Sequence, residues 1–177
     1  MTEFHTETQE PREIDGLHAM INETEQEIPM RAFHARIERL YAHIGQASSE
    51  VDVVITSDEE IQRLNREWRQ VDEPTDVLSF PMREGEPPEI ASQLPLGDVV
   101  ISLDTALRYV ESCRHRDRIN EGVAPLTESW SLLDELTFLF IHSTLHLLGY
   151  DHAEPEEERV MRDLEREWMM YILESEK

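Results

Sequence analysis

Three histidines stand close together where the most apolar segment of the chain ends. His142 and His146 are four residues apart within a run of leucine, phenylalanine and isoleucine, and His152 follows Gly149. On a helix, side chains four residues apart project from one face, so both imidazoles can reach a common ion. Gly149 suits the left-handed conformation that ends a helix, and the chain reversal brings His152 back as a third nitrogen donor. This spacing predicts a metal site with the ligands of a catalytic zinc.

The clustering of the histidines favours ligation over simple packing. Three of the eight histidines fall within eleven positions, and their burial would leave polar atoms unpaired unless they share a partner. We expect one Zn²⁺ ion, which lowers the pKa of its bound water to about 7 and so provides hydroxide. Ni²⁺ or Co²⁺ can substitute, because the same ligands accept them. The remaining histidines are expected to be surface or packing residues: His5, His18, His34, His43 and His115.

A peptidase is one alternative for this site. The spacing His-x3-His-x2-Gly-x2-His also matches the metzincin peptidases, in which a glutamate directly after the first histidine is the general base. Here that position is Ser143, which does not accept a proton from water at neutral pH. A metallopeptidase would therefore need a nearby carboxylate, such as Asp151, in its place.

The elements that position the histidines alternate between strands and helices. Runs rich in β-branched residues predict strands over these ranges: 13–22, 51–55, 77–80 and 96–102. Apolar periodicity and capping residues predict helices over these ranges: 29–44, 57–71, 104–112, 132–148 and 154–172. The last of these helices is expected to pack over the helix that carries the metal site. In the helix over 57–71, Ile61, Leu64 and Trp68 are expected to form the buried side.

Two stretches are expected to be loops. Residues 82–95 contain glycine and three prolines without periodicity, and residues 114–128 are polar and end in turn-forming residues. The chain of 177 residues suits one domain. We expect a single compact α/β domain over 13–177, with a small mixed β-sheet layered with helices and the metal site on a buried helix. Residues 1–12 are expected to form a flexible acidic arm.

Charge and cysteine usage limit the partners. With 16 basic and 39 acidic side chains, the net charge is −23, so a broad basic face for nucleic acid is excluded and any such contact must be local. No apolar run approaches the length of about 18 residues that crosses a bilayer, so no membrane partner is expected. The lone Cys113 closes no internal disulfide, which suits a reducing compartment, and we expect a cytoplasmic protein. Oligomeric state is left open.

Several motifs resemble one known family. The segment HSTLHLLGYDH over 142–152 resembles the signature of the YbeY endoribonucleases, which are bacterial factors of ribosomal RNA maturation. The match extends to Leu64-Asn65 through Trp68-Arg69, to PTDVLSFP over 74–81 and to LGDVVIS over 96–102. Separate motifs in the same order are far more specific than the histidine spacing alone.

The resemblance implies a function as well as a fold. It implies zinc held by His142, His146 and His152, cleavage of single-stranded RNA, and roles in small-subunit (16S) ribosomal RNA processing and ribosome quality control. Partners would be ribosomal RNA and the small ribosomal subunit with its associated proteins. It also marks Arg69 as a catalytic residue, because a guanidinium can clamp the phosphate oxygens on which charge builds up. The alternative in another class is a non-catalytic ribosome assembly factor with a structural zinc.

Three features leave the residue roles open. Asp76 and Asp98 can hold loops, orient a ligating histidine or act on substrate. The family usually has glycine where this chain has Ser143, which is expected to add bulk beside the first ligand. The stretch 114–128 is longer than the family's usual link; its arginines Arg114, Arg116 and Arg118 either add RNA contacts or belong to an ordinary surface insertion.

Overall fold

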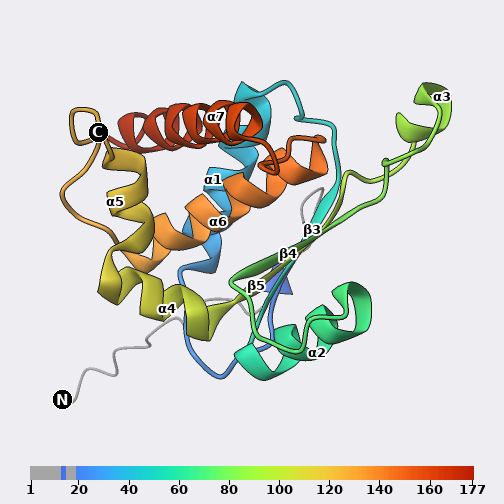
Figure 1. Ribbon diagram of the computed structural model, residues 1–177, viewed down its shortest axis with the longest axis horizontal. Helices are drawn as coiled ribbons and strands as arrows, with labels where there is room; N and C mark the ends of the chain where they lie inside the picture. Colours follow the sequence, from blue (N-terminus) through green and yellow to red (C-terminus); the bar gives the residue numbers. More distant parts are fainter. Residues whose placement is uncertain (1–12, 15–18) are drawn as a thin grey trace, which may run out of the picture.

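The computed structural model describes residues 13–14 and 19–177, which form one mixed β-sheet between two layers of helices (Figure 1). The strands are β1 (Glu13–Ile14), β2 (Met20–Asn22), β3 (Val51–Thr56), β4 (Val77–Pro81) and β5 (Gly97–Ser102). Their order across the sheet is β1-β2-β3-β5-β4. β2, β3 and β5 run parallel, while β1 and β4 pair antiparallel at the edges. The predicted mixed sheet of an α/β fold is therefore confirmed.

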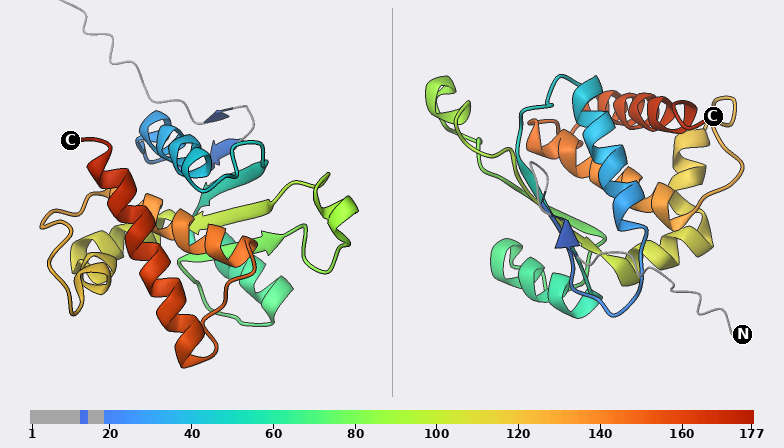
Figure 2. Two further views of the ribbon diagram at one scale, coloured as in Figure 1. Left: turned by 90° about the horizontal axis from the view of Figure 1, so that it is seen from above. Right: turned by 180° about the vertical axis from the view of Figure 1, so that it is seen from behind.

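The helices divide unequally between the two faces of the sheet. They are α1 (Met30–His43), α2 (Asp58–Arg69), α3 (Pro88–Ala91), α4 (Leu103–Ser112), α5 (Arg114–Asn120), α6 (Leu132–Leu147) and α7 (Pro155–Glu174). α2 covers one face, and α1, α6 and α7 lie on the other (Figure 1). Seen from above, α7 crosses over α6 on the side away from the sheet, as the sequence predicts (Figure 2).

Alternation along the central strands fills a core on each face of the sheet. Val53 and Val99 are opposite each other in β3 and β5, and both belong to the large core beneath α1 and α6. Val100, one residue further on, points to the other face and packs with Ile61 of α2. This is the result expected from side chains that alternate between the two faces of a pleated sheet. The β-branched runs therefore determine where both helical layers dock.

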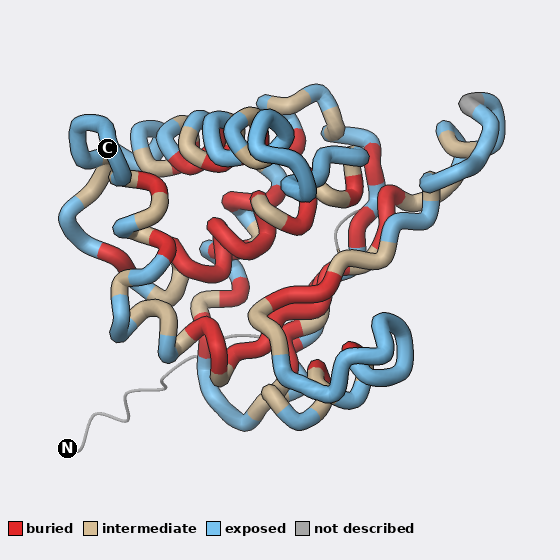
Figure 3. Tube along the Cα trace, viewed as in Figure 1, coloured by how far each residue is buried: buried red, intermediate tan, exposed pale blue. Residues whose placement is uncertain are grey.

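The large core surrounds α6. Its side chains from Asp134 to Ile141 are all buried, and the tube coloured by burial shows this helix as the most continuously buried one (Figure 3). α6 packs against β4 and β5 below it and against α1, α4 and α7 around it. A helix that is apolar on all sides needs such an environment, so the prediction of a buried helix is confirmed.

Three local predictions are wrong. Trp68 lies on the exposed side of α2 with 65% of its surface accessible, because α2 is amphipathic and only Ile61 and Asn65 are buried on it. Residues 114–128 are not a loop throughout, since α5 occupies their first half and buries His115 and Ile119. The predicted loop over 82–95 also contains the short helix α3, at the tip of the extended connection between β4 and β5 (Figure 1).

The predicted acidic arm over 1–12 lies outside the described residues. In place of the single strand predicted over 13–22, the described residues form the two short strands β1 and β2. Residues 15–18 between these strands also lie outside the described residues. Among the described helices, none combines the length and the apolar character that crossing a membrane requires.

Candidate metal centre

The two ends of α6 explain how the histidines are placed. At the N-terminus, the Ser131 hydroxyl accepts a hydrogen bond from the Asp134 amide, and the Asp134 carboxylate accepts one from the Ser131 amide. This capping box fixes where the helix starts. At the other end Gly149 has a φ of 92°, and the Tyr150 amide donates to the Leu145 carbonyl at 2.9 Å. The left-handed residue reverses the chain over the last turn of α6.

The reversal brings the three predicted histidines together. Ring centroids lie 4.7 Å apart for His142 and His146, 5.1 Å for His146 and His152, and 5.7 Å for His142 and His152. One ring nitrogen from each residue lies within 4.8 Å of the other two. A tetrahedral ion with metal to nitrogen distances of about 2.0–2.1 Å places its nitrogen ligands roughly 3.3 Å apart, so small side-chain adjustments suffice. The three side chains are therefore a group that could hold a metal ion.

The partners of the other ring nitrogens fit a shared cation. His142 Nδ1 lies 2.7 Å from a Glu165 carboxylate oxygen, and His146 Nδ1 lies 3.0 Å from the Tyr150 carbonyl oxygen. Because both partners are acceptors, Nδ1 is the atom that donates in each ring, and in the neutral form of each ring Nε2 carries a lone pair. These two Nε2 atoms lie only 3.2 Å apart. Facing lone pairs repel, so the arrangement suits a positive ion that both nitrogens bind.

The pKa of His146 also fits metal ligation. Burial lowers its pKa, and the nearby His142 and His152 rings lower it further. The lowered pKa favours the neutral form of the ring, which ligation requires.

The sequence does not reveal that Glu165 and Arg118 lie behind the three histidines. Glu165 is fully buried on α7, where one oxygen accepts from His142 and the other pairs with Arg118 of α5 at 3.0 Å. Burial alone would raise the pKa of Glu165, but the His142 hydrogen bond and the Arg118 charge hold it below its ordinary value. The sequence signal that could have revealed the burial of Glu165 is its helical spacing: it lies four residues after Met161 and four before Met169, on the buried face of α7.

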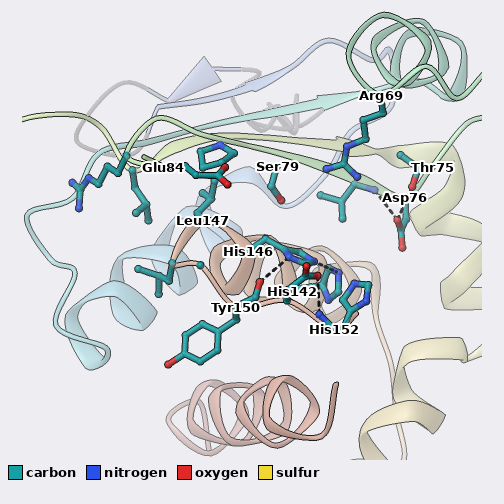
Figure 4. Close-up of a pocket in the computed structure, with 17 residues that line it drawn as sticks. Arg69, Thr75, Asp76, Ser79, Glu84, His142, His146, Leu147, Tyr150 and His152 are labelled. Carbon is teal, nitrogen blue, oxygen red and sulfur yellow. Dashed lines mark hydrogen bonds between the residues drawn. The ribbon is translucent and has the colours of Figure 1, made fainter. Parts of the chain in front are cut away.

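The histidines line one wall of a groove of about 800 Å³. Across the groove lie β4 and the segment before it, with Thr75, Asp76 and Ser79. Arg69 extends from the end of α2 toward the histidines (Figure 4). The groove therefore brings the guanidinium of Arg69 and the three imidazoles to one surface of the molecule.

Asp76, Asp98 and Ser143 occupy three different environments. The Asp76 carboxylate accepts from the Val77 amide at 2.9 Å and from the Thr75 hydroxyl at 3.1 Å, so it holds its own loop. Asp98 lies on β5 outside the groove lining, and burial raises its pKa, as does the charge of Asp52. Ser143 is completely buried and does not line the groove, so it adds no bulk to the face that the groove exposes.

The fold and the site together define an α/β protein with a three-histidine candidate metal centre in an open groove. A family model described as "Endoribonuclease YbeY" matches residues 19–172. The chain belongs to this YbeY family, which confirms the resemblance found in its motifs.

Individual relatives agree with the family model. The Endoribonuclease YbeY of Heliobacterium modesticaldum is 40% identical over 137 residues, which cover 68% of this chain and 74% of the relative. That of Aquifex aeolicus is 43% identical over 123 residues, 69% of each chain. The solution structure of TM1509 from Thermotoga maritima has a TM-score of 0.54 at 23% identity, covering 89% of this chain and 90% of that one. This last likeness supports the fold alone.

Proposed function

We propose that this chain is a zinc-dependent endoribonuclease that cleaves single-stranded RNA. The observation that carries the proposal is the convergence of His142, His146 and His152 within 4.8 Å on the wall of a groove that Arg69 also lines. Relatives of this chain are named Endoribonuclease YbeY, and this name fits a phosphodiester substrate.

The residues divide the chemical work between them. His142, His146 and His152 would hold one Zn²⁺, which supplies a Lewis acid and a source of hydroxide at neutral pH. Arg69 would bind the non-bridging phosphate oxygens through paired hydrogen bonds, which strengthen as negative charge develops on them. Ni²⁺ or Co²⁺ would be accepted by the same imidazoles.

The proposed setting is the maturation of small-subunit (16S) ribosomal RNA and ribosome quality control in the cytoplasm. The net charge of −23 means that RNA repels the chain at long range, so the chain would need partners to bring it to its substrate. A ribosomal setting supplies such partners. Partners on the small ribosomal subunit would supply the positioning that the chain lacks alone. The alternative of an assembly factor with a purely structural metal is less well supported, because two of the histidines are partly accessible and His152 is exposed.

The substitution His146→Ala tests the proposal when folding is monitored beside activity. Cleavage of a single-stranded RNA oligonucleotide by the zinc-loaded protein should fall by at least about 10³-fold, as expected when the metal that generates the nucleophile is lost. The thermal unfolding midpoint of the metal-free protein should barely change. His43→Ala is the matched control, since His43 is exposed on α1 and stacks on Tyr171 instead.

Retained cleavage in His146→Ala would overturn the nuclease assignment to this centre. Collapse of the fold on metal removal would favour the structural-zinc alternative. Hydrolysis of casein by the purified zinc form would revive the peptidase alternative, with Asp151 as the carboxylate.

A further inference from the structure

The segment 114–128, which the sequence predicts to be a surface insertion, is connected to the candidate metal centre on the side away from the groove. Arg118 is on α5, and its guanidinium donates to the Glu165 carboxylate from Nε at 3.1 Å and pairs with it from Nη2 at 3.0 Å. Glu165 in turn lies 2.7 Å from His142 Nδ1. Side chains from three helices, α5, α7 and α6, are thus connected in one line that ends on a candidate metal ligand.

Each contact in this line is constrained. Glu165 has no accessible surface, and Arg118 is 27% exposed, so the carboxylate has no bulk water to replace either partner. A buried carboxylate that loses its cation is costly, because its desolvation is then uncompensated. Arg118 therefore holds the Glu165 carboxylate in place, and the carboxylate fixes both the tautomer and the rotation of the His142 ring.

α5 itself is anchored to the body of the protein. His115 Nδ1 lies 2.6 Å from the Glu135 carboxylate of α6, which also accepts from the Trp130 indole at 2.7 Å. Arg166 of α7 donates to the backbone carbonyls of Ile119 and of Ala124, the latter at 2.8 Å. These contacts fix α5 at both ends, so Arg118 approaches Glu165 from a rigid support.

We propose that the α5 segment is part of the metal centre, with Arg118 acting through Glu165 as a positioning residue for His142. This inference rests on the proposed metal site at the three histidines. Arg118 then does not contact RNA, and its effect is on how tightly and in which geometry the ion is held.

The first test measures metal affinity in variants of the full chain. Competition of Zn²⁺ against a chromophoric chelator should show binding about tenfold weaker in Arg118→Gln and about 10- to 100-fold weaker in Glu165→Gln, the range seen for partners of ligating histidines. Arg118→Lys, which keeps the charge, should lie between Arg118→Gln and the wild type. Arg116→Gln is the matched control on the same helix, because within the described part of the chain Arg116 donates only to Asp117 and to the Glu128 carbonyl.

A purely structural role gives a different result. It would lower the unfolding midpoints of the metal-free and metal-loaded forms equally and leave the zinc dissociation constant and the visible spectrum of the Co²⁺-loaded protein unchanged. Arg118→Gln with the affinity of Arg116→Gln would overturn the proposal. Failure of the wild type itself to bind zinc would overturn the metal site, and this outcome is distinguishable because it does not depend on a variant.

A measurement on the wild type covers the case in which the variants do not fold. Long-range ¹H–¹⁵N correlation spectra of the zinc-loaded protein should show His142 with its proton on Nδ1 and its Nε2 bound to the ion. Coordination through Nδ1 would contradict the proposed role of Glu165.

Discussion

Arg69 is a residue whose exposed position suits substrate binding better than folding. Its side chain lines the groove and has no hydrogen bond or ion pair to another described residue. Arg69→Gln should lower kcat/KM for single-stranded RNA by about 10²–10³-fold, the usual loss when one donor to a developing oxyanion is removed. Zinc content and the unfolding midpoint should stay at wild-type values.

The neighbouring Arg66 provides the control for that prediction. It belongs to the same helix, is exposed, and pairs with Asp72 at 3.2 Å instead of facing the groove. Arg66→Gln should cleave RNA like the wild type. Equal losses in the two variants would mean that general positive charge on α2 matters, and a specific role for Arg69 would then fail.

At the scale of single residues, the sequence reveals ligand candidates more readily than their supports. His142, His146 and His152 could be predicted because helical spacing and a glycine are local properties. Glu165 is 23 residues from its partner His142 in the sequence, and Arg118 is 47 residues from its partner Glu165. Only tertiary packing brings these pairs together. Charged side chains are also poor predictors of burial, because most of them are exposed.

Gly97 determines how closely β4 approaches β5. Its φ is 150°, and a Cβ atom there would lie 2.3 Å from the Phe80 carbonyl oxygen and 2.8 Å from Leu147 Cδ2. Gly97→Ala should lower the free energy of unfolding in urea by about 2–6 kcal/mol, since backbone strain and overpacking each cost about 1–3 kcal/mol. Gly85→Ala also starts from a positive φ, 77°, but meets nothing within 4 Å.

The control should therefore show only the strain cost of about 1–2 kcal/mol. A loss in Gly97→Ala no larger than that in Gly85→Ala would show that the strands separate freely. Because Leu147 lines the groove, we also expect Gly97→Ala to alter the groove wall.

The segment after α7 is attached to α1 and α6 through a buried arginine. Arg36 donates to Glu176 at 2.9 and 2.6 Å and to Asp134 at 2.9 Å. The hydrogen bond from Arg36 holds the pKa of Glu176 below its ordinary value of 4.5. A lowered folded pKa means that this stabilisation is complete above pH 4.5 and is lost as the pH falls through the folded value.

Glu176→Gln should therefore reduce the free energy of unfolding by about 1–2 kcal/mol at pH 7, the value of a charged hydrogen bond that is partly exposed. The difference from the wild type should disappear in acid below the lowered pKa. Denaturant unfolding across this pH range measures it, with the exposed Glu174→Gln as control. A difference that persists or grows in acid would contradict the assigned ion pair.

At the scale of elements, periodicity predicts helices better than it predicts their exposure. Ranges such as 29–44 and 104–112 are close to α1 and α4 because capping and apolar spacing act locally. Trp68 was misplaced because hydrophobicity alone assigned it to the core, whereas α2 covers only a small second core and leaves its last turn exposed. α5 was missed because a short polar helix depends on distant partners such as Glu135 and Glu165 for its stability.

At the scale of the whole molecule, the arginines of the groove would attract RNA locally, while the net negative charge would repel it. Two arginines that line the groove, Arg69 and Arg83, are available for phosphates, while the net charge is −23. Arg83 already donates to the Leu94 carbonyl at 2.9 Å, but a guanidinium has further N–H donors. The number of phosphates that the protein neutralises should therefore be small, and salt should weaken its affinity for RNA less than it does for a protein with many phosphate contacts.

A salt titration measures this balance. Anisotropy of a short labelled single-stranded RNA with metal-free protein should give a slope of log K against log salt of about −1.4, since each neutralised phosphate of a single strand contributes about −0.7. Arg83→Gln should bring the slope to about −0.7. Screening of the acidic surface acts in the opposite direction and can only flatten both values. A slope of about −4 or steeper would require several more phosphate contacts than the groove offers. The strand would then lie on another surface, and the proposed dependence on ribosomal partners for positioning would lose its basis.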